Sequence, residues 1–225
     1  MELTSYATEV AARLMPAERS EGCAELLVAL LGELVKGHPV QRDAFAATLG
    51  WSAERLTALL EQEPCTEYDD DGNVIGYGIT LRETAHAFEV DGQRLYTWCA
   101  LDALMFPGMI GKTARVFSRC PATGLSVSLT VTPEGLRDVE PTSAVVSLPL
   151  LEAAPNIRSS FCCHVNFYAS TSAAPRSVHQ RMELVCVEDA FRVGQLIADS
   201  LTTGAAAGAT SPRSELRSQT CHANP

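Results

Sequence analysis

The sequence has few basic residues and no long apolar run. Its 225 residues include 17 Lys and Arg against 27 Asp and Glu, which gives a formal net charge of −10 at pH 7. Affinity for a nucleic-acid backbone and for an anionic membrane surface comes largely from Lys and Arg. No apolar stretch approaches the roughly 18 residues that a membrane-spanning helix needs. We therefore expect neither a nucleic acid nor a membrane as a partner.

Two further motifs are missing. Residues 1–6 have no basic segment, and no apolar segment follows them, so we expect no secretory signal and a cytoplasmic protein whose thiols stay reduced. The eight cysteines form no Cys-x-x-Cys pair, which excludes the usual zinc-ribbon and thioredoxin motifs. Hydrophobic residues make up 46% of the chain, enough for a core that needs no disulfide scaffold.

The first third of the chain has helical patterns followed by a hairpin. Leucines and Val35 lie on one helical face over residues 24–36, and shorter helices are predicted at 42–49 and 53–62, the last with Ser52 as its N-cap. Residues 67–78 contain an Asp-Gly-Asn turn typical of a hairpin. The pattern predicts a three-helix, winged-helix-like domain over residues 1–80.

This pattern leaves DNA binding as an alternative, in the form of a thiol- or metal-sensing winged-helix transcription regulator. The charge of the segment disfavours it. Residues 22–80 hold ten acidic side chains and three basic ones, and acidic residues occupy the wing. A surface of this sign repels a duplex. We interpret the segment as a packing module.

The rest of the chain is richer in strands. Strands are predicted at 81–90, 94–98, 112–120, 125–132, 144–148, 160–169 and 183–187. A short helix is predicted at 99–105, ended by Pro107 and Gly108, with a closing helix at 188–201 and a loop at 170–180. The fold class is therefore α+β, with a mixed, mainly antiparallel, sheet-rich catalytic part at 81–202. Residues 203–225, rich in Ala, Gly, Ser and Thr, are predicted to be a disordered tail.

Cys99 and Asp102 carry the clearest chemical signal. On a helix, residues three apart lie on one face, so the carboxylate can lie beside the sulfur. A helix N-terminus lowers the pKa of a thiol, which predicts a thiolate at Cys99, whereas a neighbouring carboxylate opposes the thiolate. The pair makes more sense if Asp102 takes a proton and passes it on. Packing as a small buried hydrophobe remains the alternative for Cys99.

A second thiol cluster is Cys162-Cys163-His164. On a strand, Cys162 and Cys163 point to opposite faces, so only one can join a given site. Two thiolates and a carboxylate would suit a soft metal. A zinc site of Cys162, Cys163 and His164 is an alternative, disfavoured by the absence of paired ligands. The remaining cysteines are interpreted as packing residues or, at the end of the chain, as part of the tail: Cys23, Cys65, Cys120, Cys186 and Cys221.

Several longer motifs resemble one known family. They are Thr-Glu-Tyr-Asp at 66–69, Asp-Gly-Asn-Val-Ile-Gly-Tyr-Gly at 71–78, Leu-Arg-Glu-Thr at 81–84, Leu-Tyr-Thr-Trp-Cys-Ala-Leu-Asp at 95–102, Thr-Ala-Arg-Val at 113–116, Ala-Thr-Gly at 122–124 and Ser-Phe-Cys-Cys-His-Val at 160–165. Together they resemble the organomercurial (alkylmercury) lyases over residues 22–200. The segments before Gly22 and after Leu201 show no matching motif.

The resemblance implies a cytoplasmic bacterial mercury-resistance enzyme that cleaves carbon–mercury bonds by protonolysis to a hydrocarbon and Hg(II). Its catalytic residues map onto Cys99, Asp102 and Cys162, with mercury of substrate and product held by Cys99 and Cys162. One cysteine, helped by Asp102, would bind mercury, the other would add a second sulfur, and Asp102 would protonate the carbon. No cofactor is implied, and external thiols or a mercuric reductase would take the Hg(II). Trp98, Met105 and Phe161 are candidates for an apolar pocket.

Overall fold

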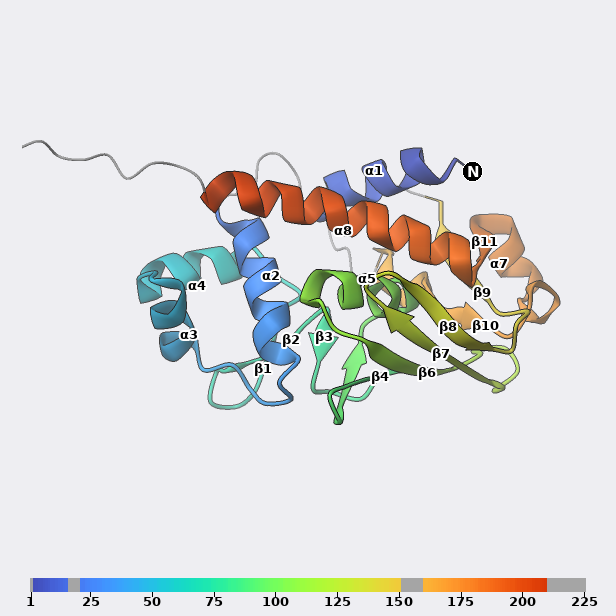
Figure 1. Cartoon of the computed structure of the whole chain (residues 1–225), viewed down its shortest axis with the longest axis horizontal. Helices are drawn as coiled ribbons and strands as arrows, with labels where there is room; N and C mark the ends of the chain where they lie inside the picture. The colour runs from blue at the N-terminus through green and yellow to red at the C-terminus, as the bar shows by residue number, and fades with distance from the viewer. Residues whose placement is uncertain (1, 16–20, 151–159, 210–225) are drawn as a thin grey trace, which may run out of the picture.

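The computed structural model describes residues 2–15, 21–150 and 160–209 (Figure 1). Its helices are α1 (Leu3–Leu14), α2 (Cys23–Leu34), α3 (Arg42–Leu49), α4 (Ala53–Glu61), α5 (Ala100–Ile110), α7 (Arg176–Arg181) and α8 (Val187–Ala209), with 3-10 turns η1 (Cys162–His164) and η2 (Thr171–Ala173). Its strands are β1 (Glu67–Tyr68), β2 (Val74–Tyr77), β3 (Ile79–Thr80), β4 (His86–Val90), β5 (Gln93–Thr97), β6 (Ala114–Arg119), β7 (Ser126–Thr132), β8 (Gly135–Glu140), β9 (Val145–Pro149), β10 (Phe167–Tyr168) and β11 (Met182–Cys186).

The strands form two antiparallel sheets. The large sheet has eight strands in the order β1-β2-β3-β5-β4-β6-β7-β8, and the small one has the order β10-β9-β11. Helices come first along the chain and strands dominate afterwards. This arrangement confirms the predicted α+β class with an antiparallel, sheet-rich second part.

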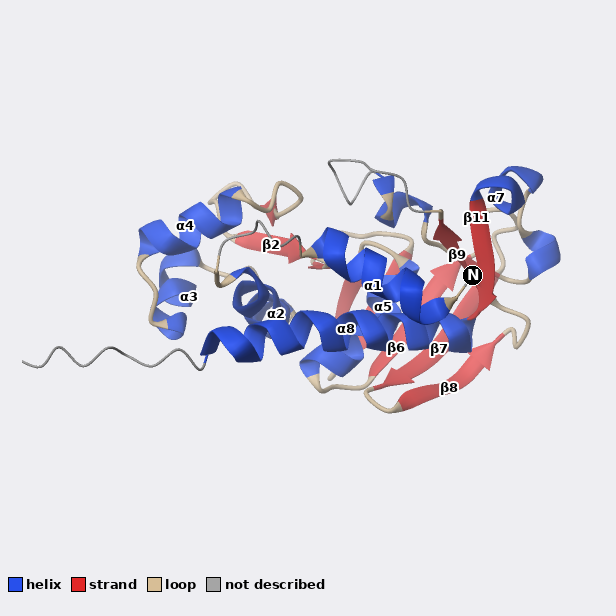
Figure 2. Cartoon of the chain, turned by 90° about the horizontal axis from the view of Figure 1, so that it is seen from above, coloured by secondary structure: helices blue, strands red, loops and turns tan. Residues whose placement is uncertain are grey.

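Helix α8 organises the packing. It runs along the large sheet, contacts α1, α2 and α5, and has α5 between itself and the strands of that sheet (Figures 1 and 2). One hydrophobic cluster of buried side chains extends from α1 and α2 through the sheet to α8. The helical and sheet-rich parts of the chain therefore share a core, and this core surrounds the start of α5.

The N-terminal part contains the three predicted helices and one more. Helix α3 has the predicted bounds, and Ser52 caps α4 by accepting a hydrogen bond from the Arg55 N–H at 3.2 Å, as predicted. Helix α1 was not predicted. The predicted hairpin is present as β1 and β2, and the next strand, β3, pairs with β5 through Ile79 and Thr97. The wing is thus the edge of the large sheet.

Gly78 joins this edge to the start of α5. Its φ of +77° is a left-handed conformation that favours glycine, and an added Cβ would lie 2.5 Å from the Phe106 ring of α5. The Gly78 carbonyl accepts a hydrogen bond from the Trp98 N–H at 3.0 Å. Gly78 is therefore fixed between the Phe106 ring and Trp98, the residue before Cys99.

Helix α5 does not end where the sequence predicted. It continues through Pro107 to Ile110 and ends at Gly111, whose φ is +65°. A proline in a helix removes one backbone hydrogen bond. Pro107 and the residues before it are buried, so packing of this segment outweighs the loss.

Two other predictions were wrong in the second part. The strand predicted at 160–169 is a 3-10 turn, η1, followed by the two-residue strand β10. Hydrogen bonds from the His164 N–H to the Phe161 carbonyl at 2.9 Å and from the Val165 N–H to the Cys162 carbonyl at 3.2 Å form this turn. The alternation of side chains that predicted a strand over 160–169 is equally compatible with such a turn. The loop predicted at 170–180 contains η2 and α7.

The predicted tail begins too early. Residues 203–209 belong to α8, since alanines of this segment favour continuing a helix that is already anchored by its buried face. Residues 210–225, with Cys221, lie outside the described part of the chain. Within the part that is described, α8 and the other helices fall short of the length or apolarity needed to cross a bilayer.

A buried dithiol–carboxylate site at the start of α5

Cys99 is the N-cap of α5. Its backbone is extended (φ −149°, ψ 172°), and its Sγ accepts a hydrogen bond from the Asp102 N–H at 3.4 Å. Its carbonyl accepts from the Thr97 hydroxyl at 3.0 Å. The thiol therefore takes the role that Ser or Asp usually has at a helix start. The same geometry places the Asp102 side chain on the face of the helix that carries the sulfur.

Cys162 reaches the same place from a distant part of the sequence. It lies in η1, and the residue after that turn, Val165, accepts a hydrogen bond from the Ala100 N–H at 3.1 Å. Ser147 of β9 holds the turn from the other side: its hydroxyl donates to the His164 carbonyl at 2.7 Å and accepts from the Asn166 N–H at 3.1 Å. These bonds fix the turn that carries Cys162 against the first residue of α5.

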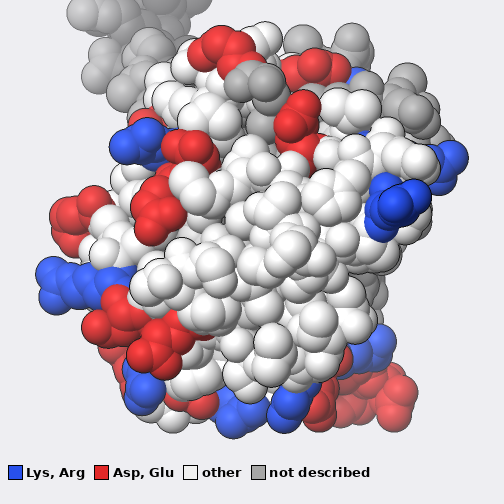
Figure 3. All heavy atoms as spheres, turned by 90° about the vertical axis from the view of Figure 1, so that its right-hand side faces the viewer, with Lys and Arg blue, Asp and Glu red and all other residues white. Residues whose placement is uncertain are grey.

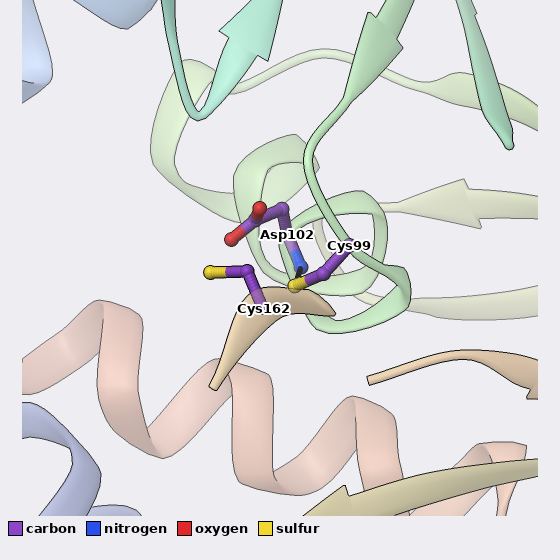
Figure 4. A group of neighbouring side chains, drawn as sticks. All are labelled: Cys99, Asp102 and Cys162. Carbon is purple, nitrogen blue, oxygen red and sulfur yellow. Dashed lines mark hydrogen bonds between the residues drawn. The ribbon is translucent and has the colours of Figure 1, made fainter. Parts of the chain in front are cut away.

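The three functional atoms converge. Sγ of Cys99, Sγ of Cys162 and a carboxylate oxygen of Asp102 all lie within 4.8 Å of one another (Figure 4). Both cysteines are buried, and Oδ2 of Asp102 is shielded from solvent. A metal–thiolate bond is about 2.3 Å long for zinc, so two sulfurs at this separation can bind the same soft atom. The structure thus brings together all three residues that the sequence nominated.

The surroundings of Cys99 shift its pKa upward. Burial raises the pKa of the Cys99 thiol well above its usual value, and the neighbouring Cys162 thiol and Asp102 carboxylate raise it further. The hydrogen bond from the Asp102 N–H at the helix start lowers the pKa but does not offset these effects. The pKa of Cys99 is therefore shifted against the thiolate that the helix start by itself favours, because helix-end stabilisation acts on a group that burial has already removed from water.

The predicted zinc alternative does not match the geometry. Cys163 and His164 are exposed, whereas Cys162 is buried, so the three side chains of the turn do not face one site. Among the described residues, the group of potential metal ligands comprises Cys99, Asp102 and Cys162. The predicted separation of Cys162 from Cys163 is confirmed, although a 3-10 turn rather than a strand produces it.

The predicted pocket residues belong to the hydrophobic core that contains the site. Met105 and Phe161 are buried and belong to the same hydrophobic cluster as Cys99 and Cys162, and Trp98 packs against that cluster. The Trp98 ring meets the Tyr77 ring edge to face at 6.4 Å between centroids. The dithiol is therefore buried in an apolar core.

Two residues near the site were missed by sequence reasoning. Ser147 is buried and holds the turn of Cys162, but a serine inside an apolar strand has no distinctive local signal. Tyr6 is buried on α1, and a charge on Cys99 raises its pKa after burial itself, which puts its phenol in electrostatic range of the thiol. The helical spacing of Tyr6, Val10 and Ala11 was a signal for α1, although not for its place in the fold.

The fold and the site define an α+β protein with a buried pair of thiols and a carboxylate, spaced so that one soft metal atom could bind both sulfurs. Two family models match the chain: alkylmercury lyase over residues 79–199 and the helix-turn-helix domain of alkylmercury lyase over residues 5–78. The chain belongs to the alkylmercury lyase family. Because the helix-turn-helix match is to a domain of that family, it lends no support to a transcription regulator.

Individual relatives agree with the family match. The chain is 55% identical to an alkylmercury lyase from Pseudomonas putida over 203 residues, which cover 89% of this chain and 96% of the relative. It is 46% identical to one from Staphylococcus epidermidis, covering 74% and 78% of the two chains, and 39% identical to one from Streptomyces lividans, covering 90% and 97%. The fold is also similar to a structure described as the mercury-bound form of MerB2, with a TM-score of 0.74, 18% identity, and coverage of 89% and 98%.

Proposed function

We propose that this protein cleaves the carbon–mercury bond of organomercury compounds by protonolysis, releasing a hydrocarbon and Hg(II). The observation that carries the proposal is the convergence of two buried thiols and a carboxylate within 4.8 Å in a chain of the alkylmercury lyase family. An organomercurial and two thiols yield one hydrocarbon, one Hg(II) bound by two thiolates, and the protonated leaving ligand.

The proposed steps assign a role to each side chain. One of Cys99 and Cys162 replaces the leaving ligand on mercury, and its proton leaves with that ligand. The other thiol passes its proton to Asp102 as its sulfur binds mercury. The electron pair of the carbon–mercury bond then takes the proton from Asp102, which acts as a general acid. A raised pKa at Cys99 supports this scheme, because the reaction needs a proton that is kept until mercury replaces it.

The surroundings support binding of an apolar substrate without a cofactor. Trp98, Met105 and Phe161 would contact the organic group and exclude water from the developing carbanion. Hg(II) would remain on Cys99 and Cys162 until external thiols or a mercuric reductase remove it. The described cysteines form no disulfide, which fits a role in mercury detoxification inside the reducing cytoplasm.

We also propose that nucleic acid is not a partner. The acidic balance of residues 22–80 opposes a duplex. At the end of the molecule that carries α7 and β11, the surface is largely uncharged, with both signs at its margin and no concentration of Lys and Arg (Figure 3). A mobility-shift assay with random duplex at low salt is expected to show no complex, and clear binding would revive the regulator hypothesis.

The decisive assay is release of benzene from phenylmercuric acetate in the presence of excess thiol. The unmodified protein should produce benzene, whereas Cys99→Ala, Cys162→Ala and Asp102→Ala should each lose about 10³-fold or more of the rate, since residues of one catalytic unit fail together. Cys186→Ala, which removes an exposed thiol of β11, is the matched control and should retain the full rate. Absence of benzene from the unmodified protein would exclude the proposed reaction.

A further inference from the structure

The N-terminal helix contributes a tyrosine to the region of the thiol pair. Helix α1 packs along α8 with its buried residues Tyr6, Ala7, Val10 and Ala11, and it lies beside α8 in the view from above (Figure 2). These residues belong to the same hydrophobic cluster as Cys99 and Cys162. A helix outside the sheet-rich part of the chain therefore covers part of the core that encloses the site.

One hydrogen bond connects this helix to the sheet-rich part. The Tyr6 hydroxyl donates to the carbonyl of Pro149, at the end of β9, over 3.0 Å, and the bond is buried. Two residues earlier in the same strand, Ser147 holds the turn that carries Cys162. Strand β9 thus joins α1 and Cys162 through two neighbouring anchors.

The pKa of Tyr6 also indicates that its side chain lies near Cys99. Burial raises the pKa of Tyr6, and a charge on Cys99 raises it further. The phenol is therefore close enough to the thiol to respond to its charge. It stays protonated at neutral pH and remains a donor to Pro149.

We propose that Tyr6 is a positioning residue of the thiol site: its bond to Pro149 docks α1 over the core around Cys99 and Cys162, and so sets how often the site opens to a mercurial. Because both thiols are buried, a reagent reaches them only after some covering element moves. Among the described residues, helix α1 packs through its apolar face and this bond, and its undocking would open the core that also contains the thiols. The relation to organomercurial substrates rests on the proposed function, whereas the docking of α1 does not.

The test is Tyr6→Phe, which keeps the ring and removes the hydroxyl. Loss of one neutral buried hydrogen bond should shift the opening equilibrium about 5- to 10-fold. In the folded protein at a fixed pH, N-ethylmaleimide should therefore label Cys99 and Cys162 about 5- to 10-fold faster, as followed by mass spectrometry. Cys163, which is exposed, is the internal reference and should keep its rate.

The matched control is Tyr68→Phe, which removes the hydroxyl of a half-buried tyrosine in β1. It should leave the labelling of Cys99 and Cys162 unchanged. Hydrogen exchange should show faster exchange in α1 but not in α2 for Tyr6→Phe. Unchanged labelling of Cys99 and Cys162 in Tyr6→Phe, or an equal increase at the buried Cys120, would overturn the proposal, since the latter indicates global unfolding.

A second variant guards against misfolding of the first. Val10→Ala thins the same buried face of α1 without touching the hydrogen bond. It should accelerate the same two labelling reactions, and no acceleration would contradict the proposal. In the benzene assay, Tyr6→Phe should lower KM for phenylmercuric acetate and leave kcat within about 2-fold, because chemistry still takes place in the docked state. Absence of benzene from the unmodified protein would refute the proposed function alone, since labelling reports docking independently.

Discussion

Cys99 and Cys120 are both almost fully buried, each 1% exposed, and both lie where a regular element meets a loop. Their acidities nevertheless move in opposite directions. Burial, Cys162 and Asp102 raise the pKa of Cys99. Burial alone would also raise the pKa of Cys120, but hydrogen bonds from the Thr123 hydroxyl and from nearby backbone N–H groups lower it below its usual value.

The difference lies in what surrounds each sulfur. Cys120 meets several donors of the following turn and of Ala169, a surrounding that stabilises a thiolate. Cys99 meets one backbone donor, a second thiol and a carboxylate, a surrounding that holds a proton. Cys120 also packs in a separate hydrophobic cluster away from the pair. Burial alone therefore does not make a thiol reactive, and the thiol site is distinguished by its neighbours.

The largest expected effect is on the carboxylate that completes this surrounding. Asp102→Asn keeps the N–H that bonds Cys99 but cannot carry the proton. It should lower kcat for benzene release about 10²- to 10⁴-fold, the usual contribution of a general acid. Binding of Hg(II), measured by ultraviolet difference absorbance of the thiolate complex, should persist. An activity near that of the unmodified protein would remove Asp102 from the mechanism.

His86 is a third buried titratable group, and unlike the two thiols it is a base. Burial lowers the pKa of His86 to about 4, while its ring bonds the Ser118 hydroxyl at 3.0 Å. In the unfolded chain His86 binds a proton near pH 6.5, whereas in the folded chain it binds one only at a lower pH. The free energy of unfolding therefore decreases as the pH drops from about 6.5 to about 4, by at most about 3 kcal/mol. Urea unfolding across this range measures the loss.

The control for this titration is His86→Gln, which retains a hydrogen-bonding group beside Ser118. Between pH 6.5 and 4 its free energy of unfolding should depend less steeply on pH, because the slope loses the contribution of about one bound proton. Identical slopes for the variant and the unmodified protein would show that His86 does not titrate in this window.

A smaller effect is expected at Cys120. Cys120→Ala leaves the donors of the turn without their sulfur, which should cost about 1–2 kcal/mol of unfolding free energy. The rate of benzene release should stay within about 2-fold, because the side chain lies outside the cluster of Cys99. A large loss of rate at preserved stability would show that the two buried thiols are functionally linked, and the contrast between them would fail.

The smallest effect is expected at Cys163, the neighbour of Cys162 in η1. Its side chain is exposed, so Cys163→Ala should retain most of the benzene-forming activity and change stability by less than about 0.5 kcal/mol. The measurement is a side-by-side rate with Cys162→Ala. Equal losses for the two variants would mean that the exposed thiol takes part in the reaction.

Much of the local structure could be predicted from local signals. The bounds of α3, the cap at Ser52, the hairpin of β1 and β2 and most strands follow from caps, turns and apolar periodicity. The errors have one physical origin. At Pro107 and in η1, packing decides between alternatives that short-range preference leaves nearly equal in energy.

The site divides in the same way. The pairing of Cys99 with Asp102 was predictable, because three residues on a helix fix which side chains meet. Motif resemblance named Cys162 as their partner, but no local rule placed it there. Ser147 and Tyr6 act through contacts with residues far away in the chain, and for that reason neither had a recognisable signal.

By itself, the sequence determined the acidic balance, the α+β pattern and the spacing that joins a thiol to a carboxylate at a helix start. The tertiary structure decided which second thiol faces that pair, how the turn of Cys162 is held, and the burial that raises the pKa of Cys99. The reason is physical: helix spacing and capping act within a few residues. Burial and the meeting of α5, β9 and η1 depend on the packing of the whole chain.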